Sequence, residues 1–137
     1  MGIKASHEDD IKEFTKLLGD DLAVNDTDKV TTLFQYNKTL YETVGPLIKD
    51  ERMMVRVALN IVMDDLIESR PDDVHLALPS LIPLLKDESP TVRGDAADLI
   101  GMIGDKSQIA VLEPLLKDPH PQVVEMVKES IEALESS

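Results

Sequence analysis

Cysteine is absent from the 137-residue sequence. The chain can therefore form no disulfide, no thiolate metal site and no cysteine nucleophile. No apolar run approaches the roughly 18 residues that a membrane-spanning helix needs. Residues 1–10 also lack the apolar stretch of a signal peptide. We therefore expect a soluble, cytoplasmic protein without a membrane partner.

Basic residues are scarce, since 14 Lys and Arg stand against 27 Asp and Glu, a formal net charge of −13. Proteins bind nucleic acids largely through Lys and Arg side chains that displace condensed counterions, so we expect no nucleic-acid partner.

Aromatic residues are few and confined to the N-terminal third of the chain: Phe14, Phe34, Tyr36 and Tyr41. The core of the N-terminal third should therefore pack differently from the core of the remaining chain.

A five-residue motif, Pro-Leu-Leu/Ile-Lys-Asp, recurs along the sequence at residues 46–50, 83–87 and 114–118. Each copy is followed by apolar residues spaced as on one helix face and preceded by a shorter apolar segment. The repeating unit is therefore helix, turn, helix. We predict a single domain with a degenerate cap repeat followed by three full repeats. Their bounds are 1–137 for the domain, 1–37 for the cap, and 38–69, 72–104 and 105–137 for the repeats.

Helix start and stop signals agree with this unit. Ser89 before a proline predicts an N-cap, and Asp105 with Gln108 predicts a capping box. Gly104, a residue that tolerates left-handed geometry, is expected to end the preceding helix.

Two other local signals predict interruptions. Pro79 and Pro83 lie inside an otherwise helical apolar segment, which they should bend or break. Within the cap repeat, residues 19–21 (Gly-Asp-Asp) predict a turn between two short amphipathic helices.

The string LLKDESPTVRGDAADLIGMIGD, residues 84–105, resembles the HEAT-repeat family in the short variety also called phycobilisome-lyase-like HEAT repeats. The resemblance extends over residues 46–137. It implies an all-α, armadillo-like fold: a right-handed α-solenoid, or α-α superhelix, of about four helical hairpins.

In such repeats, an Asp in the turn and an Arg early in the second helix bond to the turns and to the neighbouring repeat. The pairs in this sequence are Asp50 with Arg56 and Asp87 with Arg93. The last copy keeps Asp118 but has Val124 in place of the arginine. The resemblance implies that Arg93 bonds turn carbonyls together with the carboxylate of Asp87 or Asp50.

The family implies a non-catalytic protein–protein interaction module, such as a scaffold, a small adaptor or an accessory subunit. A partner segment would bind on the concave face formed by the second helices.

The alternative is an accessory enzyme of the chromophore-lyase or HEAT-type metal-hydroxylase kind. The hydroxylases of this architecture carry several His-Glu pairs, because two metal ions need many ligands. This sequence has one such pair, His7 and Glu8.

The three histidines are weak candidates for a catalytic or metal-binding site. They are His7, His75 and His120. They fall in different repeats, and the stacking of repeats should not bring them to one site. His75 is expected to be half-buried.

An acidic cluster in the cap repeat suggests a calcium site, but it lacks the residue order of an EF-hand, and roles in turns and helix caps explain it. It consists of Asp20, Asp21, Asn25, Asp26 and Asp28. We predict no enzyme activity, no catalytic residue, no cofactor and no metal.

The outward positions of the second helices are the predicted partner-binding residues. In the helix that begins near residue 53, apolar residues occupy positions that the next repeat fills with Thr91, Gly94 and Asp98. Such a patch indicates an interface, or else a helix that is buried all round. The predicted site consists of Met54, Val57 and Ile61 with the flanking acids Asp95, Asp98, Glu125 and Glu129. Its partner would be another protein with a basic and apolar segment.

Overall fold

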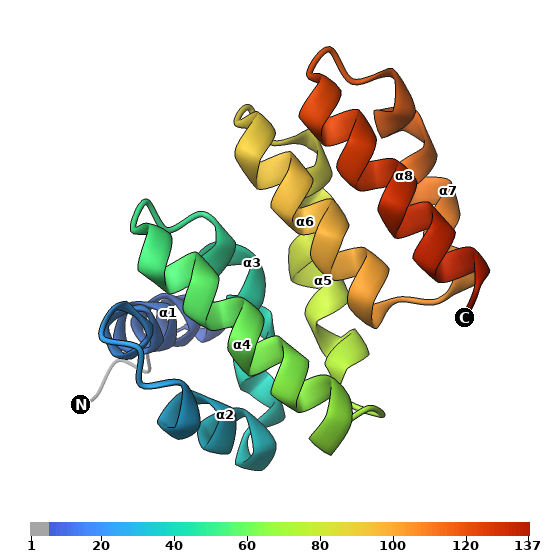
Figure 1. Cartoon of the computed structure of the whole chain (residues 1–137). Coiled ribbons are helices and arrows are strands. Elements are labelled where there is room, and N and C mark those ends of the chain that lie inside the picture. The colour runs from blue at the N-terminus through green and yellow to red at the C-terminus, as the bar shows by residue number, and fades with distance from the viewer. Residues whose placement is uncertain (1–5) are drawn as a thin grey trace. The chain divides into compact units, whose positions relative to one another are not determined.

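The computed structural model describes residues 6–137, and within them the chain forms only helices, turns and loops (Figure 1). The predicted all-α class of helical hairpins is thereby confirmed. The chain divides into two compact units, Met1–Leu76 and Ala77–Ser137. No helix in the described part is both long enough and apolar enough to cross a membrane.

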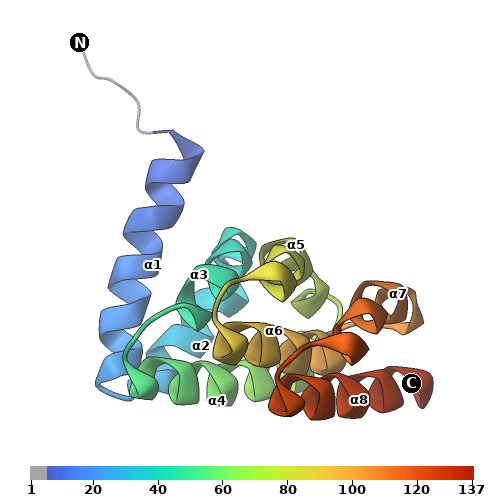
Figure 2. The same cartoon turned by 90° about the horizontal axis from the view of Figure 1, so that it is seen from above.

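The N-terminal unit is built on one long helix, α4, against which α1, α2 and α3 pack. Figure 2 shows α1 running across the direction of α4. The elements are α1 (His7–Ala23), α2 (Thr27–Tyr36), the 3-10 helix η1 (Lys38–Thr43), α3 (Val44–Ile48) and α4 (Met53–Ser69). The 3-10 helix η2 (Val74–Ala77) follows at the boundary between the units.

The predicted turn at residues 19–21 is wrong, because α1 continues through these residues to Ala23. The turn comes later, at Asn25, whose φ of 61° lies in the left-handed region. Gly19 is buried instead where α1 passes the side chains of Arg52 and Asp50. A Cβ on Gly19 would lie 3.1 Å from Arg52 Nη2 and 3.3 Å from Asp50 Oδ2, so a larger residue would displace these side chains by a few tenths of an ångström.

Aromatic packing holds the N-terminal unit together, as the sequence indicates. Phe34 on α2 and Tyr41 on η1 make an edge-to-face contact with ring centroids 5.2 Å apart. Both side chains are buried, together with Leu22, Leu59 and Met63. Burial raises the pKa of the Tyr41 hydroxyl to about 12.

The C-terminal unit has two helical layers. In Figure 1, α6 and α8 run side by side in the same direction, with α5 and α7 behind them. The elements are α5 (Leu78–Leu81), η3 (Ile82–Lys86), α6 (Pro90–Ile103), η4 (Lys106–Gln108), α7 (Ile109–Leu112), η5 (Glu113–Lys117) and α8 (Pro121–Glu135). The core between the layers includes Leu81, Leu99, Ile100, Leu112 and Leu134.

Prolines break the first helix of each repeat, as predicted. Pro79 and Pro83 divide residues 74–86 into the short segments η2, α5 and η3. The same succession of 3-10 and α turns recurs over 106–117, where Pro114 stands at the start of η5.

Both ends of α6 lie at the predicted residues. Ser89 accepts a hydrogen bond from the Val92 amide, and Asp105 and Gln108 form the predicted capping box at the start of η4. Gly104 ends α6 as predicted, and its backbone there is extended (φ −86°, ψ −172°). A Cβ at residue 104 would lie 2.8 Å from the Ile100 carbonyl oxygen and from Gln108 Oε1, so close contact favours glycine at this position.

Candidate functional site

An apolar strip on the outer face of α4 is the clearest candidate for a binding surface. Its members are Met53, Met54, Val57 and Ile61, with 70%, 47%, 46% and 43% of their surfaces exposed. The opposite face of the same helix is buried, at Val55, Leu59, Val62 and Leu66. The alternative of a helix buried all round is therefore wrong. Ala58, the residue that follows Val57, is fully buried.

Acidic residues follow the apolar strip at the C-terminal end of α4. Asp64, Asp65 and Glu68 are all exposed, and Asp65 lies one helical turn beyond Ile61. Comparison of the repeats places Asp65 among the outward positions of the helix, but the predicted site did not include these three carboxylates.

The other predicted site residues lie in the C-terminal unit. Asp95 and Asp98 are half-buried on α6, and Glu125 and Glu129 are exposed on α8. α6 and α8 pack against each other, so these four carboxylates belong to one two-helix layer. The apolar strip belongs to the N-terminal unit, and each set of residues therefore forms a surface of its own unit.

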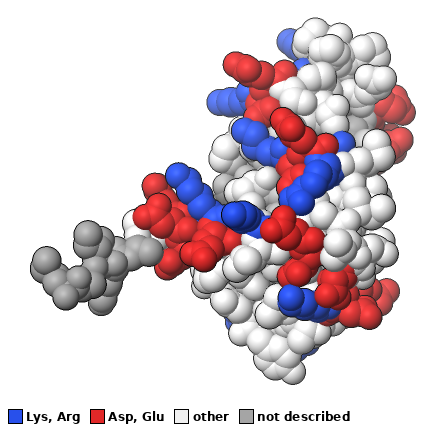
Figure 3. All heavy atoms as spheres, turned by 90° about the vertical axis from the view of Figure 1, so that its left-hand side faces the viewer, with Lys and Arg blue, Asp and Glu red and all other residues white. Residues whose placement is uncertain are grey.

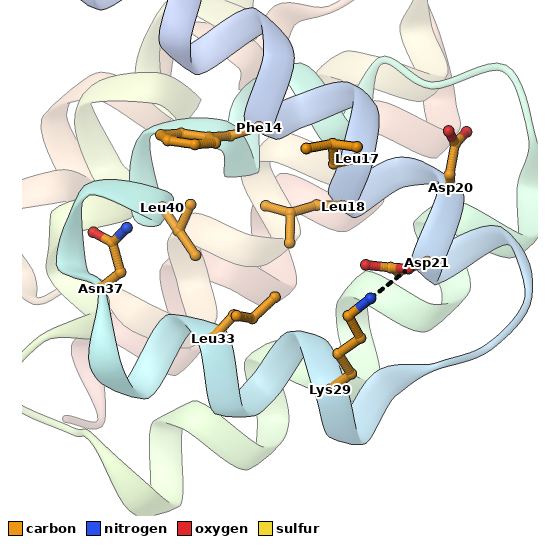
Figure 4. Close-up of a pocket in the computed structure, with 9 residues that line it drawn as sticks. All are labelled: Phe14, Leu17, Leu18, Asp20, Asp21, Lys29, Leu33, Asn37 and Leu40. Atoms are coloured by element: carbon orange, nitrogen blue, oxygen red, sulfur yellow. Dashed lines mark hydrogen bonds and ion pairs between the residues drawn. The ribbon is translucent and has the colours of Figure 1, made fainter.

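A pocket of about 390 Å³ opens in the N-terminal unit between α1, α2 and η1 (Figure 4). Its wall is apolar, and a salt bridge of 3.2 Å between Lys29 and Asp21 crosses one side. The apolar lining consists of Phe14, Leu17, Leu18, Leu33 and Leu40. The sequence analysis missed this pocket. The sequence feature that could have predicted it is the number of apolar residues in α1, which exceeds what one buried helix face accommodates, since Leu17 remains exposed.

Two members of the acidic cluster of the cap repeat form ion pairs, Asp21 with Lys29 and Asp20 with Arg52, each at 3.2 Å. Arg52 also binds Asp50 at 2.9 Å, and this bond holds the pKa of Asp50 below its usual range. No group of three His, Asp or Glu residues within 6–137 is arranged to hold a metal ion.

The three histidines are all exposed. His7 Nε2 bonds both carboxylate oxygens of Glu42, at 2.8 and 3.0 Å, and this partner raises the pKa of His7 above 6.5. His75 and His120 are exposed. The expectation that His75 is half-buried is therefore wrong, because its side chain falls on the outer side of η2.

Arg93 is fixed in a structural network within the C-terminal unit. Its Nη1 donates to the carbonyls of Asp87 and Glu88, at 2.8 and 3.1 Å, as expected for a turn. The carboxylate partner is neither Asp87 nor Asp50 but Asp118, in the turn of the following repeat. The guanidinium lowers the pKa of the Asp118 carboxyl.

Figure 3 shows one face of the molecule, on which acidic and basic side chains lie beside one another. Next to the grey N-terminal residues, acidic side chains predominate. This region is α1, in which two lysines stand among six acidic residues.

The family described as HEAT repeats matches residues 66–135. A segment of 49 residues is 43% identical to deoxyhypusine hydroxylase-B of Oryza sativa subsp. japonica. The segment covers 36% of this chain and 16% of the rice protein, so the chain spans a small part of that relative's length. No solved structure matches the chain significantly.

Proposed function

Because the chain belongs to the HEAT-repeat family, we propose that it is a non-catalytic interaction module that binds a segment of another protein. The apolar strip of α4 is the observation that carries this proposal. Soluble proteins seldom leave several large apolar side chains exposed on one helix face unless a partner covers them. The strip would supply the buried centre of the interface.

The charge next to the strip determines the kind of partner. Asp64, Asp65 and Glu68 lie at its C-terminal end and stay exposed. Burial of apolar side chains supplies affinity, and opposite charges at the margin speed the encounter. The partner segment should therefore present apolar anchors with Lys or Arg at one end.

Paired substitutions test this proposal. Val57→Glu with Ile61→Glu places two charges on the strip. The matched control is Val111→Glu with Leu116→Glu, at apolar positions of similar exposure on the first helices of the C-terminal unit. The wild type and both variants are immobilised at equal density and used to capture proteins from the source cell, with quantification by mass spectrometry.

A captured protein is then purified, and its binding segment is mapped and titrated against all three proteins. We expect the wild type and the control to bind a basic and apolar segment, and the α4 variant to lose it. Equal binding by the α4 variant would overturn the proposal. So would a concentration-dependent dimer of the wild type that the α4 variant abolishes, because a second copy would then cover the strip.

A second candidate function is an accessory enzyme of the metal-hydroxylase kind. The 49-residue similarity to the rice protein favours it. The described residues offer no ready set of metal ligands, so such an activity would need ligands from outside them. Visible absorbance that develops in air after anaerobic incubation with ferrous iron and desalting would favour this candidate over the interaction module.

A further inference from the structure

Gly94, in the interior of α6, is a glycine that the fold does not require. Glycine is the least favourable residue in a helix interior apart from proline. The backbone at Gly94 does not have a positive φ. A Cβ built at this residue would meet no described heavy atom within 4 Å. Neither conformation nor packing therefore explains the glycine.

Other glycines of the same unit differ in this respect. A Cβ on Gly101 would lie 2.7 Å from the Cβ of Ser130, because α6 and α8 touch at that point. The repeat itself also accepts a side chain at the position of Gly94. The equivalent residues of the neighbouring repeats are Val57 and Glu125, and both are exposed.

The absent side chain leaves a hollow between α6 and α8. The helices are held together at Ser130, whose Oγ donates to the Ala97 carbonyl at 2.8 Å. Nearer their N-termini they enclose a hollow of about 250 Å³. Its lining includes Thr91, Gly94, Asp95, Gln122, Val123 and Met126.

We propose that this hollow receives the side chain of a lysine or arginine from a partner protein. Met126, next to the buried Val123, offers an apolar surface to the methylene stem. Oxygen atoms of Asp95 and Gln122 line the same hollow and can accept hydrogen bonds from the charged head. The glycine lets the stem lie against the backbone of α6. This inference rests on the proposed function, since it names one residue type that a partner presents to the C-terminal unit.

The surrounding charge favours a cation over an apolar anchor. On α8, which forms one side of the hollow, four glutamates stand against one lysine, and Glu125 and Glu129 are exposed. Arg93, the arginine of α6, is occupied with Asp118. The field at the hollow is therefore negative, and it disfavours an acidic side chain.

Capped pentapeptides test this inference without knowledge of the partner. The probe is Ala-Ala-Lys-Ala-Ala, compared with the same peptide carrying norleucine or glutamate at the centre. Norleucine keeps the aliphatic stem and removes the charge. Binding is followed by two-dimensional amide NMR of the full chain. We expect the lysine peptide to shift the Gly94 and Val123 signals saturably, with a dissociation constant of about 1 to 10 mM.

Two pairs of variants connect the shifts to the hollow. Gly94→Ala and Gly94→Val fill the hollow and should weaken the lysine peptide about tenfold or more. Their melting temperatures should equal or exceed that of the wild type, so lost binding would not report a broken fold. Asp95→Asn should weaken the peptide by about tenfold, whereas Asp98→Asn, a half-buried carboxylate of α6 outside the hollow, should change it less.

Equal binding of the norleucine peptide would overturn the inference, because the hollow would then select an apolar side chain. Absence of saturable shifts, or binding unaffected by Gly94→Val, would also overturn it. The proposed function is tested separately, by the α4 variant Val57→Glu with Ile61→Glu. If Gly94→Val still binds the captured partner while the α4 variant does not, the interaction module stands and the cation pocket is wrong.

Discussion

Arg93 Nε donates to Asp118 Oδ2 across 2.8 Å, and Arg93 Nη2 donates to Asp118 Oδ1 across 3.1 Å. The two side chains keep only 12% and 4% of their surfaces exposed. This fork ties the start of α6 to the turn before α8, while Arg93 also closes its own turn through the Asp87 carbonyl. One side chain thus joins two successive repeats.

We expect Arg93→Ala to lower the free energy of unfolding by about 1 to 3 kcal/mol, because its buried acceptors lose their donor. Urea denaturation measures the loss. Combining Arg93→Ala with Asp118→Ala should cost less than the sum of the single changes, as coupled partners do. Unchanged stability together with lost partner binding would show that Arg93 belongs to the binding surface instead.

The His7–Glu42 pair predicts a pH-dependent contribution to stability. Because the folded-state pKa of His7 is raised above 6.5, this contribution is fully present below about pH 6.5 and is lost as the pH rises through the folded-state pKa. NMR titration of the His7 ring should show the raised pKa. In Glu42→Gln the pKa should return toward 6.5, and an unchanged value would contradict the assigned cause.

Substitution of the two glycines of α6 by alanine should change the free energy of unfolding in opposite directions. Gly101→Ala brings a methyl group against Ser130, and we expect a loss of about 1 to 3 kcal/mol from overpacking. Gly94→Ala enters open space and should stabilise the chain by about 0.5 to 1 kcal/mol through helix propensity. The melting temperatures of both variants, measured by thermal unfolding, test this prediction. Destabilisation by Gly94→Ala would mean that the hollow is filled in solution.

Neighbouring residues of α4 allow a similar contrast. Val57→Glu should change the free energy of unfolding by no more than about 0.5 kcal/mol, because the side chain is exposed. Ala58→Glu should cost roughly 3 kcal/mol or more, since it buries an unpaired charge. If Val57→Glu unfolds the protein, the apolar strip is part of the core in solution.

Much of the fold could be predicted from the sequence because its determinants are local. The repeated Pro-Leu-Leu-Lys-Asp motif, the N-cap at Ser89 and the capping box at Asp105 act within a few residues, and each lies where predicted. Gly19 was misjudged for the opposite reason. It lies inside α1 against the side chains of Arg52 and Asp50, and one-dimensional patterns do not record such contacts.

The candidate site was predictable only in part. Comparison of repeats identified Met54, Val57 and Ile61, and the structure adds that they are exposed while Ala58 is not. A helix face spans about 100°, so spacing alone misplaces residues at its border. The partner of Arg93 was misassigned because the link runs to the following repeat, a direction that spacing does not determine.

The exposed face of α4 contains two thioethers. Met53 and Met54 lie open to solvent, whereas Met63 on the same helix is fully buried. Oxidation to the sulfoxide turns an apolar side chain into a polar one and can be reversed by reductases. Dilute hydrogen peroxide should therefore modify Met53 and Met54 well before Met63, as peptide mass spectrometry would show, and equal rates would contradict this order. An oxidant would then weaken the apolar strip reversibly while the helix that carries it stays folded.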